Sequence, residues 1–183
     1  MSIEREKSSK DLQNAHKYKE LHNIKIRYQT FASETFEVLK VSKDFIEFQK
    51  RKGSYDEEIY SIRLKSLINM ASVYFMALFE GFTRSFIKKV VSIEYGIDKR
   101  QFDKWYFKFN DILDNILRKK FHINLSRHFN QWNIIQELRY ARNQVVHNGK
   151  SMIPDFKIIK MCFDALIAYF NFLESRIKNL LEN

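Results

Sequence analysis

Apolar residues recur every three or four positions along most of this chain, which is the spacing of one face of an α-helix. The first long stretch of this kind, residues 13–51, carries them at Ile24, Tyr28, Phe31, Val38, Val41, Phe45 and Phe48. We expect these side chains to face the core from a helix that ends at Gly53-Ser54, because glycine commonly follows a helix end.

The second stretch, residues 56–95, is apolar on most sides. Asp56-Glu57-Glu58 places negative charge where the dipole of a helix favours it, and Gly96 marks the end. One apolar stripe consists of Leu64, Ile68, Ala71, Phe75, Leu78, Phe82 and Phe86, and much of another consists of Val73, Met76, Ala77 and Ile87. A helix with this pattern is usually buried, so we expect it to lie at the centre of the fold.

The remaining sequence predicts further helices. Residues 97–129 are the least regular and suggest one or two short helices and a loop, 130–148 form another helix, and Pro154 opens the last one. Four glycines and one proline supply too few turns for a sheet. We therefore predict an all-α bundle of four to five helices in a single domain, 13–183, preceded by a flexible N-terminal arm, 1–12.

The formal net charge of +10 indicates polyanionic partners, namely RNA, DNA or an anionic membrane, although a basic surface without a partner is the simpler alternative. Basic residues alternate with aromatic ones between 97 and 129, a combination suited to single-stranded RNA. From this segment we take Lys119, Lys120 and Arg127 as RNA-binding candidates. The alternative is that the aromatic side chains fill the core and the basic ones face water.

Several classes of site have no support in the sequence. There is no CxxC, no HExxH and no glycine-rich phosphate loop, so we expect neither a metal nor a cofactor. The only cysteine, Cys162, lies in an apolar stripe and suits a reducing compartment. The polar opening residues and the lack of a long uninterrupted apolar run lead us to expect a cytoplasmic protein with no membrane partner.

Residues 137–150, ELRYARNQVVHNGK, concentrate candidate chemistry at a predicted helix end. A histidine there has its charged form favoured by the helix dipole, and an adjacent arginine offers paired donors to a phosphate. Arg139, Asn143 and His147 share a face at intervals of four, whereas Arg142 lies about 140° from His147 on an ideal helix. We expect the two to approach only if the last turn loosens at Asn148-Gly149; the simpler reading is a histidine and surface arginines at a helix end.

Glu80 is a carboxylate among the apolar residues of the second helix. A charge in such a position is costly unless it is paired, so we expect a cationic partner. Two arginines are candidates: Arg84, one turn further along the same helix, and Arg142.

The segment RNQVVH, preceded by ELRYA and followed by NG, resembles the R-x4-H signature of the HEPN superfamily, small helical domains that often act as ribonucleases. The stretch ASVYFMALFEGFTRSFIKKV resembles the second long helix of such domains. This resemblance covers most of residues 20–180 and implies an up-and-down bundle with long helices.

The resemblance implies a metal-independent endoribonuclease, plausibly a toxin or antiphage effector, or alternatively a non-catalytic module that binds RNA or protein. It implies a homodimer in which two motifs face each other across a cleft, with Arg142, Asn143 and His147 as catalytic residues. Glu80 and Arg139 would support them, and an antitoxin protein would be a partner. Gly149 occupies a position where some HEPN toxins carry a tyrosine, so modification there is not expected.

Overall fold

The computed structural model describes residues 2–106, 108–149, 153 and 155–182, with side chains from residue 17 onward. Every regular element in these ranges is a helix, which confirms the predicted all-α fold. The four long helices are α1 (Ser2–Arg51), α2 (Glu57–Tyr95), α6 (Trp132–Asn148) and α7 (Phe156–Glu182). The short elements are α3 (Lys99–Trp105), α4 (Phe109–Asp111), the π-helix η1 (Ile112–Lys120) and α5 (Leu125–His128).

The number of helices is higher than the predicted four to five, and the excess lies between residues 99 and 128. Local side-chain contacts allow such short helices to form. Asp98 and Gln101 form a reciprocal capping box at the start of α3, and the side chain of Asn124 accepts the backbone N–H of Ser126 at the start of α5. The sequence predicts only one or two helices in this segment, because elements of three to nine residues are too short to show a clear helical periodicity.

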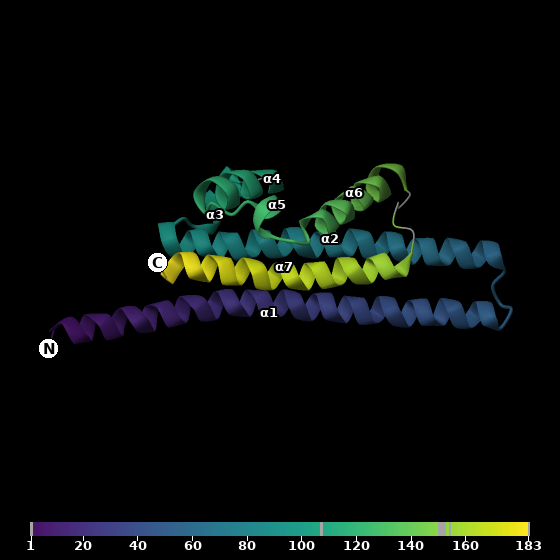
Figure 1. Ribbon diagram of the computed structural model, residues 1–183, viewed down its shortest axis with the longest axis horizontal. Helices are drawn as coiled ribbons and strands as arrows, with labels where there is room; N and C mark the ends of the chain where they lie inside the picture. The colour runs from purple at the N-terminus through teal and green to yellow at the C-terminus, as the bar shows by residue number, and fades with distance from the viewer. Residues whose placement is uncertain (1, 107, 150–152, 154, 183) are drawn as a thin grey trace.

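Three long helices, α1, α2 and α7, lie side by side, and each contacts the other two (Figure 1). α2 and α7 run in the same direction, antiparallel to α1, so both ends of the chain lie at one end of the molecule. The hairpin of α1 and α2 extends beyond α7 at the opposite end. α6 and the short helices lie over α2, on the side of the bundle away from α1.

α1 begins at Ser2, earlier than the predicted start near residue 13. Residues 1–12 are polar, but they contain neither glycine nor proline, so nothing in their sequence stops a helix from continuing through them. Residues 2–12 therefore have a helical backbone, contrary to the predicted helix start near residue 13. The flexibility of this arm stays a prediction.

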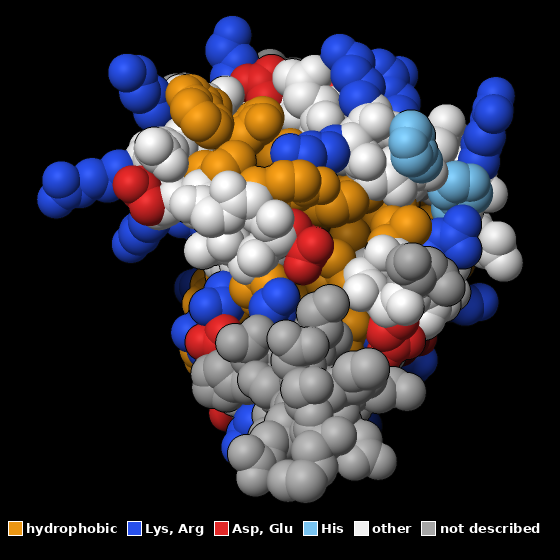
Figure 2. Space-filling view, turned by 90° about the vertical axis from the view of Figure 1, so that its left-hand side faces the viewer, with side chains coloured by type: hydrophobic (Ala, Val, Ile, Leu, Met, Phe, Trp, Pro, Cys, Tyr) orange, Lys and Arg blue, Asp and Glu red, His pale blue; other side chains and the backbone are white. Residues whose placement is uncertain are grey.

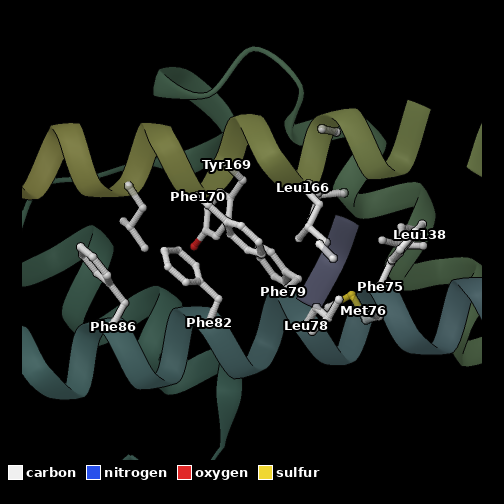
Figure 3. Close-up of a cluster of buried hydrophobic side chains, with 14 of the residues drawn as sticks. Phe75, Met76, Leu78, Phe79, Phe82, Phe86, Leu138, Leu166, Tyr169 and Phe170 are labelled. Carbon is white, nitrogen blue, oxygen red and sulfur yellow. The ribbon is translucent and has the colours of Figure 1, made fainter. Parts of the chain in front are cut away.

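α2 and α7 supply most of the core. Phe82 on α2 packs against Phe170 on α7, with ring centroids 4.3 Å apart, and Figure 3 shows how the rings of the two helices interleave. The first predicted stripe of α2 is buried apart from Leu64, which packs partly buried against the core. The second is only half right, because Met76 and Ile87 are buried but Val73 and Ala77 are exposed. On α7, the buried side chains include Cys162, Ala165 and Tyr169. Burial of large aromatic side chains is the main stabilising contribution available to a helical bundle of this kind.

The predicted core face of α1 is largely wrong. From residue 17 onward, the buried apolar residues of α1 are Leu21, Ala32, Leu39 and Ile46, whereas Phe31, Val38, Val41, Phe45 and Phe48 are 43–65% exposed. Ile24 and Tyr28, also predicted, pack partly buried against the core. α1 carries two apolar stripes, both with seven-residue spacing, and 31, 38 and 45 precede 32, 39 and 46 by one residue. One residue is a rotation of about 100°, which turns the larger side chains outward.

Gly81 on α2 lies directly against the side chain of Tyr28 on α1. A Cβ atom at this position would lie 3.2 Å from the hydroxyl oxygen of Tyr28. That hydroxyl shares a hydrogen bond of 3.0 Å with the Ser85 hydroxyl, and the Tyr28 ring packs edge-on against Phe82 and Phe170. Glycine at 81 therefore leaves room for a tyrosine that is held on three sides.

The aromatic residues between 97 and 129 mostly fill the core. Phe102, Phe121 and Phe129 are buried, while Trp105 is 54% exposed. Phe107 lies outside the described residues. For the three phenylalanines, the core alternative is confirmed over base stacking.

In the described part of the chain, α2 is the one helix long and apolar enough to cross a membrane by length and composition. Core helices of water-soluble proteins meet the same criterion, and α2 packs against α1, α3, η1, α6 and α7. The expected lack of a membrane partner stays a prediction.

Candidate functional site

The helix α6 carries the R-x4-H residues and is regular to its end. It runs through Asn148 and terminates at Gly149, whose left-handed φ of 68° places its N–H 2.9 Å from the carbonyl oxygen of Val145. Glycine adopts this conformation without the steric cost that a Cβ would bring. The last turn is therefore not loosened, contrary to the expectation that Asn148-Gly149 would let Arg142 approach His147.

Arg142 is anchored to the bundle through Glu80. Its Nη2 lies 2.5 Å from Oε1 of Glu80 on α2, and the two side chains are 28% and 32% exposed. Of the two partners expected for Glu80, Arg142 is thus confirmed. Arg84 lies one turn further along α2 and donates from Nη1 to the backbone carbonyl oxygen of Tyr106 at 2.9 Å, which ties α2 to the end of α3. A half-buried carboxylate beside a guanidinium is charge-compensated, so Glu80 is tolerated in this apolar helix.

The second arginine of the motif region makes a different connection. Arg139 donates from Nη2 to Oδ1 of Asn110, on α4, at 2.7 Å. The two arginines therefore lie in separate contacts, Arg142 with α2 and Arg139 with α4. No feature of the sequence pointed to Asn110, because it lies in the segment with the weakest periodicity.

Asn143 and His147 differ from the two arginines in making no polar side-chain contact in the described ranges. Asn143 is half-buried and His147 is exposed, and in the described ranges neither side chain makes a hydrogen bond or an ion pair. Of the two valines between Arg142 and His147, Val145 is half-buried and Val146 is 58% exposed.

Arg142 and His147 do not meet within one protomer. On a regular helix their Cα atoms are about 9 Å apart and their side chains leave the axis about 140° apart. Arg142 is turned towards α2 by Glu80, whereas His147 lies on the exposed side. Arg139, Asn143 and His147 do follow one another along a single side of the helix, as their spacing predicts.

The three RNA-binding candidates are all exposed and none of them contacts the motif. Lys119 donates to Oδ1 of Asn115 at 2.9 Å, and the Nζ of Lys120 lies 3.3 Å from the ring centroid of Tyr95. Arg127 lies in the last turn of α5. Figure 2 shows lysine and arginine side chains projecting around the rim of the end of the molecule where the chain termini lie. Charge is therefore available to a polyanion there, at the periphery of the fold.

Cys162 has the properties of a core residue. It is 1% exposed, and burial together with the nearby carboxylate of Glu137 raises the pKa of its thiol to about 12. A thiol that stays protonated near neutral pH is a poor nucleophile. Among the described side chains, no group of three or more His, Cys, Asp or Glu is placed to hold a metal ion.

No protein-family model matches this chain, and no curated protein or solved structure matches it either. The assignment of a function therefore depends on the residues and contacts described above.

Proposed function

We propose that this protein is a metal-independent endoribonuclease of the HEPN type, acting as a toxin or antiphage effector in the cytoplasm. The observation that carries the proposal is the ion pair between Glu80 and Arg142. It fixes the arginine of the R-x4-H motif to the central helix of the fold, and a fixed arginine is a better phosphate ligand than a mobile one because less freedom is lost on binding.

The guanidinium has donors left for a substrate. Arginine has five N–H donors, and the contact with Glu80 is made by Nη2 alone. The remaining donors would bind the non-bridging oxygens of a scissile phosphate and stabilise the charge that develops there. Asn143, one position along α6, would orient the phosphate or the histidine.

His147 would handle the protons. In the reaction, the 2′-hydroxyl of RNA attacks the adjacent phosphorus, its proton passes to a base, and the bond from phosphorus to the 5′-oxygen breaks. The leaving 5′-oxygen takes a proton, and a 2′,3′-cyclic phosphate remains. An exposed imidazole is suited to either proton transfer.

The separation of Arg142 and His147 within a protomer favours a homodimer with a composite site, in which a second copy brings its motif to the same phosphate. Exposed apolar residues accompany the motif and would be buried in such a contact. Val146 is 58% exposed on α6, and Met70 and Tyr74 on α2 are 52% and 53% exposed. α6 runs antiparallel to α2, so its C-terminal half extends in the direction of these α2 residues (Figure 1).

The test is cleavage of total RNA by the purified protein in EDTA. We expect cleavage by the wild type and loss of at least a hundredfold in Arg142→Ala and His147→Ala. Arg176→Ala and His22→Ala are matched controls, because they remove the same side chains from exposed positions on α7 and α1. Products ending in a cyclic phosphate would identify the 2′-hydroxyl as nucleophile.

A non-catalytic module that binds RNA or a protein is the second candidate, favoured by the exposure of Lys119, Lys120 and Arg127. It predicts RNA binding without cleavage, in the wild type as in the motif variants. Expression in cells separates the two further: the ribonuclease should arrest growth, His147→Ala should not, and a neutralising antitoxin would relieve the arrest.

A further inference from the structure

A polar pocket of about 360 Å³ lies beside the motif, between η1, the start of α5 and the N-terminal half of α6. Its polar wall includes two arginines, one aspartate, two asparagines and a tryptophan, namely Arg118, Arg139, Asp114, Asn110, Asn124 and Trp132. The volume is in the range of pockets that hold one small organic ligand. The proposed reaction does not use this space.

The pocket has one rigid side. Trp132 is half-buried, and its ring packs against Phe79 of α2 at 6.1 Å between centroids. Arg139 is held by Oδ1 of Asn110 at 2.7 Å. Asn124 is fixed through its own Oδ1, which accepts from the hydroxyl and the backbone N–H of Ser126 at 2.7 and 3.1 Å. An indole and three polar side chains are therefore held in place before any ligand arrives.

The opposite side of the pocket carries exposed charge. Arg118 and Asp114 form an ion pair of 3.4 Å on η1, and both side chains are more than half exposed. An exposed pair of this length is weak, so a ligand with a negative group can take the arginine from the aspartate.

The backbone beside the pocket is unusual. η1 is a nine-residue π-helix. At its end, the backbone N–H of Phe121 donates to the carbonyl oxygen of Ile116 at 2.9 Å, and the N–H of Ile123 donates to that of Leu117 at 2.7 Å. His122 follows it with a φ of 54°, a conformation that residues with a side chain rarely adopt. π-helices and left-handed residues are uncommon and concentrate at functional sites, where the surrounding structure holds them. Here both features flank the residues that line the pocket.

The chemistry of the lining identifies a class of ligand. A flat aromatic ring stabilises a planar base, amides donate to and accept from its edge, and arginines bind a phosphate. A single carboxylate is too little for a metal site, and the polar lining is unsuited to a lipid chain.

We propose that this pocket binds one nucleotide of single-stranded RNA, with its base beside Trp132 and its phosphate between Arg118 and Arg139. The inference rests on the proposed function, in which RNA is the substrate. Arg139 is one turn of α6 from Arg142 and Asn143, so a strand held here continues towards the motif. The pocket would then select the base next to the cleaved bond.

Tryptophan fluorescence gives a direct measurement, since the chain has only two tryptophans. Trp105→Phe removes the exposed one, which leaves Trp132 as the reporter. The probes are AMP, GMP, CMP and UMP, with ribose and inorganic phosphate as controls. We expect saturable quenching by at least one nucleotide, and no response to ribose or phosphate alone.

The same background carries the variants. Arg118→Ala and Arg139→Gln should weaken nucleotide binding at least tenfold, whereas Arg176→Ala, on exposed α7 surface, should not change it. Arg118 is more than half exposed, so its removal leaves the fold intact and the result interpretable even if Arg139→Gln disturbs α4. The pocket proposal would be overturned if none of the four nucleotides quenched the fluorescence at millimolar concentration. It would also be overturned if Arg118→Ala bound nucleotides with unchanged affinity.

Failure of the pocket and failure of the ribonuclease are distinguishable. If the wild type cleaves RNA but no nucleotide changes the fluorescence of Trp132, the nucleotide pocket is contradicted and the ribonuclease is not. If nucleotides quench the fluorescence equally in the wild type and in His147→Ala, and neither protein cleaves RNA, the pocket is supported and the ribonuclease is contradicted.

Discussion

Glu80 on α2 and Arg142 on α6, 62 positions apart in the chain, are joined by an ion pair of 2.5 Å between Oε1 and Nη2. The pair connects the central helix of the bundle to the helix that carries the R-x4-H residues. Both side chains are about a third exposed, so solvent weakens the attraction but does not remove it.

A double-mutant cycle measures this connection. We expect Glu80→Ala and Arg142→Ala each to lower the free energy of unfolding by about 1–2 kcal/mol, with a coupling energy of about 1 kcal/mol between them. Urea unfolding followed by circular dichroism gives these values. If the two effects simply add, the pair does not stabilise the fold.

The same pair should affect catalysis more than stability when only the charge is removed. Glu80→Gln keeps the size of the side chain, and we expect about tenfold slower RNA cleavage with little change in KM, because the arginine would lose its fixed position. Full activity in this variant would show that Arg142 does not need Glu80.

The composite site predicts that dimerisation and activity are lost together. Replacing Tyr74 and Val146 by lysine puts charge on the exposed apolar surface beside the motif, and both residues are more than half exposed, so the protomer should still fold. Analytical ultracentrifugation should show a shift from dimer to monomer, and cleavage should fall in parallel. Val38→Lys with Val41→Lys, on the outer face of α1, is the control. If the control pair breaks the dimer instead, the interface lies on α1 and the composite site is wrong.

The two apolar stripes of α1 should differ in their contribution to stability. Leu39 is 2% exposed and Val41 is 65% exposed. We expect Leu39→Ala to lower the free energy of unfolding by about 2–4 kcal/mol, because it leaves a cavity, and Val41→Ala by less than about 0.5 kcal/mol. Comparable losses in guanidinium unfolding would mean that the outer stripe is covered in solution.

Tyr169 should make the fold sensitive to alkali. It is fully buried, its hydroxyl shares a hydrogen bond of 2.9 Å with Thr83, and burial raises its pKa well above 10.0. The native state then keeps a proton that the unfolded state releases, so this stabilisation is complete below pH 10 and decreases as the pH rises above it. We expect Tyr169→Phe to lower stability by about 1 kcal/mol at pH 7 and to reduce the alkaline loss relative to wild type. Identical alkaline slopes would contradict this.

The reactivity of Cys162 measures how readily α6 and α7 separate. It is the only thiol, and burial and Glu137 raise its pKa from 9.0 to about 12. We expect labelling by a disulfide reagent at pH 8 to be at least a hundred times slower in the native protein than in urea, because both access and ionisation are suppressed. Labelling at the rate of a free thiol would mean that α6 and α7 separate readily.

The all-α fold and the first apolar stripe of α2 were predictable, because the apolar residues of α2 are dense enough to leave little choice of face. The face of α1 was not, since Phe31 and Ala32 begin two stripes with the same spacing, and only the packing of α2 and α7 selects between them. The sequence pattern favours the stripe with the larger side chains for the core, but these side chains are exposed.

The site was predictable in part. The pairing of Glu80 followed from the cost of burying a carboxylate, which left two candidate arginines. The contact between Arg139 and Asn110 did not follow from any pattern, because it depends on how the segment from α3 to α5 folds back on α6. The π-helix η1 was not predictable either, because its apolar residues at 112, 113, 116 and 117 have the spacing of an ordinary α-helix. The regular end of α6 overturned the expected approach of Arg142 to His147.

Gly81, next to Glu80, has a consequence for how this chain can vary. A Cβ atom at 81 would lie within 3.2–3.3 Å of the Tyr28 side chain, which Ser85 and two phenylalanine rings hold in place. Positions 28 and 81 are therefore expected to covary among related chains, with a residue larger than glycine at 81 only where 28 has become smaller than tyrosine. In this way α1, which provides no residue to the motif, restricts which sequences can keep a carboxylate in position for Arg142.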